Sequence, residues 1–133
     1  MHKIEHIGIA VKDLNASLSL FEKLLGSACY KKQEVPSEGV RTAFFKAGPN
    51  KVELLEALDD QSPIARFIAR RGEGIHHIAF EVADIAAEVK RLKAEGFQLI
   101  DEVPKAGADN KLVVFVHPKD ANGVLIELCQ EAR

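Results

Sequence analysis

The segment HIGIAVKD, residues 6–13, recurs 71 residues later as HIAFEVAD, residues 77–84. Both copies begin with His, have Val five positions later and end with Asp two positions after that Val. A second pair of segments, VEL at 52–54 and IEL at 126–128, recurs at an offset of 74 residues. Self-similarity at a nearly constant offset is typical of a chain built from structural repeats. The sequence therefore predicts two related modules.

The first module is predicted to contain one strand, one helix and three further strands. Alternating β-branched residues predict a strand at 4–11. Asp13 can cap a following helix that ends at Gly26. The apolar stripe of this helix is predicted to be Leu14, Leu18, Phe21 and Leu25. The later strands are expected near 28–35, 40–47 and 51–57, with turn signals between them.

The second module repeats this order. Asp84 is the predicted cap of a helix with Ile85, Val89 and Leu92 on one face and a stop at Gly96. Its later strands are expected near 97–102, 111–117 and 123–129. Between the modules, Ser62-Pro63 predicts the start of a connecting helix that Gly72 ends. The predicted fold is α+β: one domain over 1–133, with βαβββ modules at 1–60 and 74–133 joined by a helix at 62–72.

Composition limits the classes of partner. The net charge is -2, with 18 basic and 20 acidic residues spread along the chain, which argues against nucleic acid as a main ligand. No stretch approaches the roughly 20 apolar residues that a membrane span needs. The N-terminus has no signal-peptide hydrophobic region, so we expect a cytoplasmic protein. Cys29 and Cys129 form no C-x-x-C motif and are interpreted as buried small hydrophobic residues.

Four ligand-capable side chains are predicted to avoid the helix-covered face of the sheet. Strand side chains alternate between faces, so His6 lies opposite the apolar residues that pack under the helix, and His77 does the same in the repeat. Glu53 and Glu127 are each flanked by apolar residues and also point away from the helix. One strand histidine alone is more often structural than a ligand. The same two residue types at matching places in both copies favour a metal site, and imidazole with carboxylate suits cobalt, manganese, nickel or zinc.

The remaining histidines suggest other roles. His76 has the opposite parity to His77 and is expected to be structural. His117 precedes Pro118 at a strand end, where a loop position and a position at the rim of a cavity are equally compatible with the sequence. His2 is expected to be solvated.

Longer segments carry a resemblance to a known family. The paired His segments resemble the vicinal oxygen chelate superfamily over essentially the whole chain. More specific are SPIARFI at 62–68 with GEGIHHIAF at 72–80, and FVHPKD at 115–120 with NGVLIEL at 122–128. These stretches resemble the methylmalonyl-CoA epimerases. The resemblance implies two βαβββ modules with curved mixed sheets around a metal cavity, a cobalt ion first among divalent metals, and a homodimer.

The resemblance also implies roles for individual residues. By position, the metal ligands would be His6, Glu53, His77 and Glu127, although some relatives have Gln at the second of these places. A glutamate on the third strand has been considered as a base in some members, and Thr42 stands there in this chain. The segment 104–111 also departs from the glycine-rich turn expected at its place. Glu53 and Glu127 are therefore the candidate catalytic groups.

The implied reaction interconverts (2R)- and (2S)-methylmalonyl-CoA. One group would remove the C2 proton of the acyl-CoA, a metal would stabilise the enolate, and another group would return a proton to the opposite face. One alternative is a glyoxalase I-type lactoylglutathione lyase, which also removes a carbon-bound proton beside a metal. A non-catalytic drug-binding resistance protein is a second alternative, against which four intact ligands count. An extradiol dioxygenase fits less well, because it needs redox iron and such enzymes are usually longer.

Overall fold

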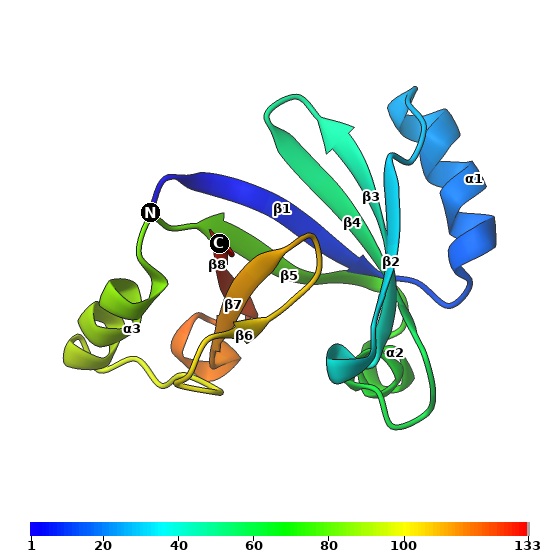
Figure 1. The fold of residues 1–133 in the computed structure, drawn as a ribbon. Helices are drawn as coiled ribbons and strands as arrows, with labels where there is room; N and C mark the ends of the chain where they lie inside the picture. The colour runs from blue at the N-terminus through cyan, green and yellow to red at the C-terminus, as the bar shows by residue number, and fades with distance from the viewer. Residues whose placement is uncertain (133) are drawn as a thin grey trace. The chain divides into compact units, whose positions relative to one another are not determined.

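The computed structural model of the protein describes residues 1–132, which contain eight strands and three α-helices (Figure 1). In chain order these are β1 (Lys3–Ala10), α1 (Leu14–Leu25), β2 (Lys31–Val35), β3 (Val40–Ala47), β4 (Asn50–Ala57), α2 (Pro63–Arg71), β5 (Gly74–Glu81), α3 (Ile85–Ala94), β6 (Lys105–Ala106), β7 (Lys111–Val116) and β8 (Ile126–Glu131). Short 3-10 helices lie at η1 (Pro36–Glu38) and η2 (Pro118–Asp120). No α-helix in the described range is both long and apolar enough to cross a membrane.

The chain forms two compact units. The N-terminal unit is His6–His76, and the C-terminal unit combines Met1–Glu5 with the chain from His77 onward. Within the N-terminal unit the strand order is β2-β3-β4-β1, and within the C-terminal unit β5-β8-β7-β6. In each unit the first long strand pairs in parallel with the last, and the last pairs antiparallel with the strand before it. This common topology confirms the predicted α+β fold of two βαβββ modules.

Helix α1 covers one face of the N-terminal sheet. Asp13 caps it by accepting a hydrogen bond from the Ala16 amide, and Gly26 ends it in the left-handed conformation at φ 71°. Leu14 and Leu18 are buried in a cluster with Val11, Ala43, Phe45 and Leu54, and Phe21 packs against it. Leu25, the last helical residue, is exposed, so the predicted apolar stripe is one turn longer than the buried face.

Helix α3 repeats this arrangement in the C-terminal unit. Asp84 accepts a hydrogen bond from the Ala87 amide, as predicted for its cap. The buried cluster comprises Val82, Ile85, Val89, Leu92, Leu99, Val114, Val116 and Leu128. The helix ends at Ala94 with Glu95 as its C-cap, one residue before the predicted stop at Gly96.

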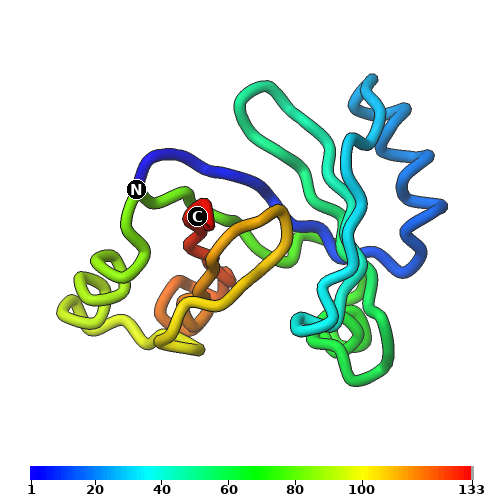
Figure 2. The backbone as a smooth tube through the Cα atoms, in the orientation of Figure 1, coloured from blue at the N-terminus to red at the C-terminus, as the bar shows by residue number. Residues whose placement is uncertain are grey.

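The prediction of a strand at 97–102 is wrong. Within the described residues this segment forms only an isolated bridge between Leu99 and Val116, and a long loop leads to β7 (yellow to orange in Figure 2). The Gln98 amide donates to the side chain of Asp120 at 2.7 Å rather than to a neighbouring strand. Besides β8, β7 pairs antiparallel with the two-residue strand β6. Two backbone hydrogen bonds flank the bridge, from the Ile100 amide to Phe115 and from the His117 amide to Gln98, so pairing with β7 is real but limited to this point. Leu99 itself is buried in the cluster under α3.

The connecting helix forms as predicted. The Ser62 side chain accepts a hydrogen bond from the Ile64 amide, Pro63 occupies the first helical position and Gly72 follows the last turn. Ile64 is buried, and α2 contacts β4 within the N-terminal unit.

Candidate metal centre and active site

The first candidate pair is His6 with Glu53 in the N-terminal unit. Strand β1 runs parallel to β4 in a register that places Gly8 opposite Glu53. His6 lies two residues earlier on the same face of β1, because side chains two apart in a strand point the same way. Its Nε2 is 3.3 Å from Oε1 of Glu53, and the two side chains are 7 and 5 % exposed.

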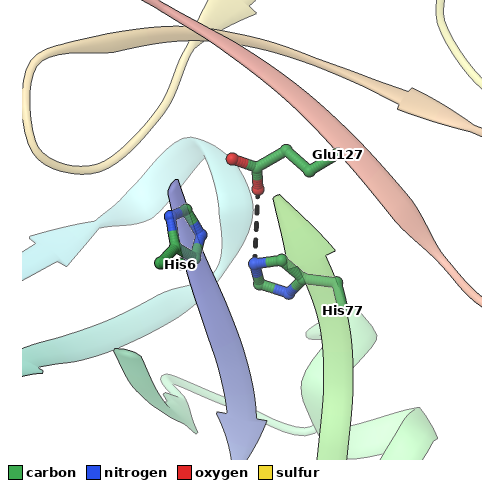
Figure 3. A group of neighbouring side chains, drawn as sticks. All are labelled: His6, His77 and Glu127. Atoms are coloured by element: carbon green, nitrogen blue, oxygen red, sulfur yellow. Dashed lines mark ion pairs between the residues drawn. The ribbon is translucent and has the colours of Figure 1, made fainter. Parts of the chain in front are cut away.

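The second pair repeats this geometry in the C-terminal unit. Strand β5 runs parallel to β8 with Ala79 opposite Glu127, and His77 again lies two residues before the partner of the glutamate. The His77 Nε2 atom is 3.4 Å from Oε1 of Glu127, the ion pair drawn as a dashed line in Figure 3. These side chains are 4 and 8 % exposed. The residues opposite the two glutamates, Gly8 and Ala79, are both small.

The chemistry of these donors fits a divalent metal. Burying a carboxylate is expensive unless a partner compensates its charge, and a buried ion pair adds little net stability even when it is well made. Two such pairs in the same register are better explained by ligand binding than by stability. Of the described residues, His6, His77 and Glu127 each offer one ligand atom that suits a divalent metal (Figure 3). Glu53, the fourth predicted ligand, is paired with His6 but does not belong to that group of three.

A buried thiol lies close to the second pair in sequence. Cys129 is two residues beyond Glu127 on β8, is fully buried and donates to the Phe80 carbonyl oxygen at 3.6 Å. Burial raises the pKa of the Cys129 thiol far above its ordinary value, and the neighbouring Glu127 charge raises it further. Cys129 is therefore a neutral hydrophobic residue, as the sequence predicts, and not a nucleophile.

The other histidines have local structural roles. His76 packs its ring against Phe67 of α2, with centroids 5.0 Å apart and ring planes at 81°. This contact agrees with the structural role predicted for it. His117 caps η2, where its Nδ1 accepts a hydrogen bond from the Lys119 amide at 3.2 Å. His2 is exposed, and its Nδ1 lies 3.7 Å from Oε2 of Glu81.

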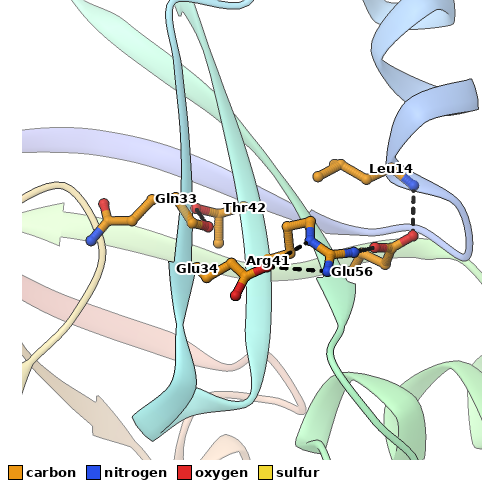
Figure 4. A network of polar contacts seen from close by, with 6 residues as sticks. All are labelled: Leu14, Gln33, Glu34, Arg41, Thr42 and Glu56. Carbon is orange, nitrogen blue, oxygen red and sulfur yellow. Dashed lines mark hydrogen bonds and ion pairs between the residues drawn. The ribbon is translucent and has the colours of Figure 1, made fainter.

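The Thr42 side chain makes a hydrogen bond within the sheet. It is fully buried in β3, and its hydroxyl donates to the Gln33 carbonyl oxygen at 3.3 Å (Figure 4). A hydroxyl fixed in this way is no base for a carbon acid.

The same region holds a network that sequence reasoning missed. Glu56 of β4 accepts hydrogen bonds from the Leu14 amide at 2.9 Å and from Arg41 Nη1 at 2.6 Å (Figure 4). Hydrogen bonds raise the pKa of the Arg41 guanidinium, the one to Glu34 more than the one to Glu56. In the C-terminal unit, Gln130 of β8 accepts from the Ile85 amide at 2.7 Å. Each module thus fixes the start of its helix with a side chain three residues after its candidate glutamate, a spacing that the VEL and IEL segments could have indicated.

Comparison with known proteins identifies the family. Residues 5–115 match the model of the Glyoxalase/Bleomycin resistance protein/Dioxygenase superfamily. The chain is 42% identical to an ethylmalonyl-CoA/methylmalonyl-CoA epimerase of Cereibacter sphaeroides, covering 96% of this chain and 97% of that protein. It is also 42% identical to the mitochondrial methylmalonyl-CoA epimerase of Dictyostelium discoideum, covering 95% of this chain and 76% of that protein.

A solved structure gives the same result. A methylmalonyl-CoA epimerase in complex with methylmalonyl-CoA and NH4+ matches with a TM-score of 0.95 at 33% identity, covering 99% of this chain and 96% of that chain. The fold, the repeated His–Glu pairs and these similarities all indicate the same family. The chain belongs to the Glyoxalase/Bleomycin resistance protein/Dioxygenase superfamily, in the group that contains the methylmalonyl-CoA epimerases.

Proposed function

We propose that this protein is a methylmalonyl-CoA epimerase, which interconverts the (2R) and (2S) forms of its substrate by moving the proton on C2. The observation that carries the proposal is the buried His–Glu pair that occurs in the same register in both units. The epimerases at 42% identity over nearly the whole chain support the substrate class.

Inversion at a carbon centre needs one group on each face. A base must remove the C2 proton from one side and an acid must return a proton from the other. Two buried carboxylates, Glu53 and Glu127, occupy matching places in the two modules, and we assign them these two roles. The Thr42 hydroxyl donates a hydrogen bond to the Gln33 carbonyl oxygen, so position 42 of β3 offers no competing base.

His6, Glu53, His77 and Glu127 are the proposed ligands of one divalent cation. The two imidazole nitrogens and the carboxylate oxygens suit cobalt, our first choice, and also manganese, nickel or zinc. When bound, the metal would act as a Lewis acid for the oxygens next to C2 and so make the C2 proton more acidic. The histidines would hold the cation throughout, and each carboxylate would move a proton only when released from it.

The assembly and location are further proposals. We propose a homodimer, because α1 exposes Leu20 and Leu24 one turn apart, an apolar pair that a second copy would cover. We propose the cytoplasm, because both cysteines are free thiols, as is usual in reducing compartments. Sedimentation of the purified protein and fractionation of cells test these two statements.

An assay with one isomer of methylmalonyl-CoA tests the activity. Protein stripped of metal by chelation and then reloaded separately with cobalt, manganese, nickel or zinc should convert the (2S) isomer to a mixture of both, and the chelated protein should not. A parallel assay with methylglyoxal and glutathione tests the lyase alternative. Turnover of the hemithioacetal without inversion of methylmalonyl-CoA would overturn the proposal.

A further inference from the structure

An aromatic ring lies across from each candidate glutamate, on the strand that pairs antiparallel with it. Phe44 of β3 is directly opposite Glu53 of β4. Phe115 of β7 is directly opposite Glu127 of β8. Directly opposed residues point to the same face of a sheet, so each ring shares a face with its glutamate.

Both rings contact the histidine of their own pair in the same way. The centroids of Phe44 and His6 are 6.4 Å apart, with ring planes at 88°. The centroids of Phe115 and His77 are 6.1 Å apart, with ring planes at 89°. Near-perpendicular rings at this separation make a favourable edge-to-face contact. The contact is repeated in two modules whose strands differ in sequence and length.

These phenylalanines are distinct from those of the helix-side cores. Phe45 follows Phe44 in β3, is equally buried and packs under α1. Phe115 packs with Ala79, Val113 and Cys129, a small cluster separate from the one under α3. Phe44 and Phe115 therefore form the apolar walls of the two His–Glu pairs.

We propose that Phe44 and Phe115 are positioning residues for the metal site. A phenyl ring offers no ligand atom, so its effect acts through the imidazole beside it. The ring restricts rotation of the imidazole and keeps its Nε2 directed at the glutamate, which reduces the freedom lost when a metal binds. This inference rests on the proposed metal site.

The test replaces each ring by an aliphatic side chain and measures cobalt binding. Phe44→Leu and Phe115→Leu keep an apolar residue but lose the edge-to-face contact. Loss of such a contact corresponds to about two- to tenfold in an equilibrium constant. Metal-free protein titrated with Co2+ should therefore bind it about two- to tenfold more weakly in each variant. The visible absorption spectrum of the bound ion should also change, because the ligand geometry is less fixed.

Matched controls separate positioning from general packing. Phe45→Leu removes an equally buried ring from the same strand, and Phe80→Leu removes a partly buried ring that packs against the helix-side cluster of the C-terminal unit. Both controls should lower the melting temperature and leave the Co2+ affinity and spectrum unchanged. Phe115 is less buried than Phe44, so Phe115→Leu keeps the test available if Phe44→Leu does not fold.

Two outcomes would overturn the inference. Equal Co2+ affinity and identical spectra in the wild type, Phe44→Leu and Phe115→Leu would show that the rings only fill space, while the metal site itself would stand. A wild-type protein that binds no Co2+ would remove the metal site and the inference together. The two failures are distinguished by the wild-type titration alone.

Discussion

Each predicted metal ligand has a counterpart in the other module with the same burial and register. His6 and His77 lie two residues before the strand partners of Glu53 and Glu127. Strand parity predicted this placement from sequence, because alternation fixes which face a residue occupies once the core-facing residues are known. Parity could not predict the ring contacts of Phe44 and Phe115, since these depend on which strands pair and in which register.

His77→Ala should abolish tight metal binding. Loss of a ligand should reduce affinity by more than the roughly 10- to 100-fold that changes to outer-shell partners cause. The adjacent His76→Ala is the matched control, because the His76 ring packs against Phe67 of α2. Its affinity for Co2+, measured by the same titration, should equal that of the wild type. Loss of binding in both variants would mean that the segment's fold, not a ligand, had been removed.

Glu53→Gln and Glu127→Gln should affect the two directions of proton transfer differently. If each carboxylate serves one face of C2, each variant should slow removal of the proton from one isomer more than from the other. Initial rates of deuterium uptake from each pure isomer measure this difference. Equal slowing of both isomers in both variants would contradict the assignment of one glutamate to each face.

The helices and strands were largely predictable because their signals are local. Asp13, Asp84 and Ser62 each cap the helix that the sequence assigned to them. The strand predicted at 97–102 is reduced to a single bridge at Leu99, because the Gln98 amide binds the Asp120 side chain instead of continuing a ladder. Strand β8 begins at Ile126 rather than near 123, because residues 121–124 form a turn in which the Val124 amide donates to the Ala121 carbonyl oxygen.

The start of α1 gives a prediction about element stability. Glu56→Ala removes the acceptor of the Leu14 amide and should destabilise the fold by about 1 kcal/mol, the usual effect of a lost N-terminal cap. Glu56→Gln should cost much less, because Gln130 performs the same function at the start of α3. Urea unfolding monitored by circular dichroism compares the two variants. Equal destabilisation by Gln and Ala would show that the ion pair with Arg41, rather than the cap, is what matters.

At the scale of the whole molecule, each unit has its own buried cluster under its own helix. The internal repeat predicted this from sequence, since two copies of one pattern imply two copies of one packing arrangement. Because each helix packs on a buried apolar cluster that includes none of the candidate ligands, we expect the fold not to depend on a metal in the way that a zinc finger does.

Chelation should therefore stop turnover and leave the fold in place. The far-ultraviolet circular dichroism spectrum should be unchanged after metal removal. The melting temperature should fall, because a ligand that binds only the folded state stabilises it. Unfolding on chelation would show that the apolar clusters are insufficient without the ion.

Deuterium incorporation at C2 of methylmalonyl-CoA tests the central claim most directly. In heavy water the metal-loaded wild type should place deuterium at C2 in step with inversion, since a proton is removed from one face and solvent deuterium returned to the other. Glu127→Gln keeps the shape of the side chain but removes its basicity, and it should slow label uptake by about 100-fold or more. Label uptake at the wild-type rate in both Glu127→Gln and Glu53→Gln would contradict the account, because these carboxylates would not be the groups that move the proton.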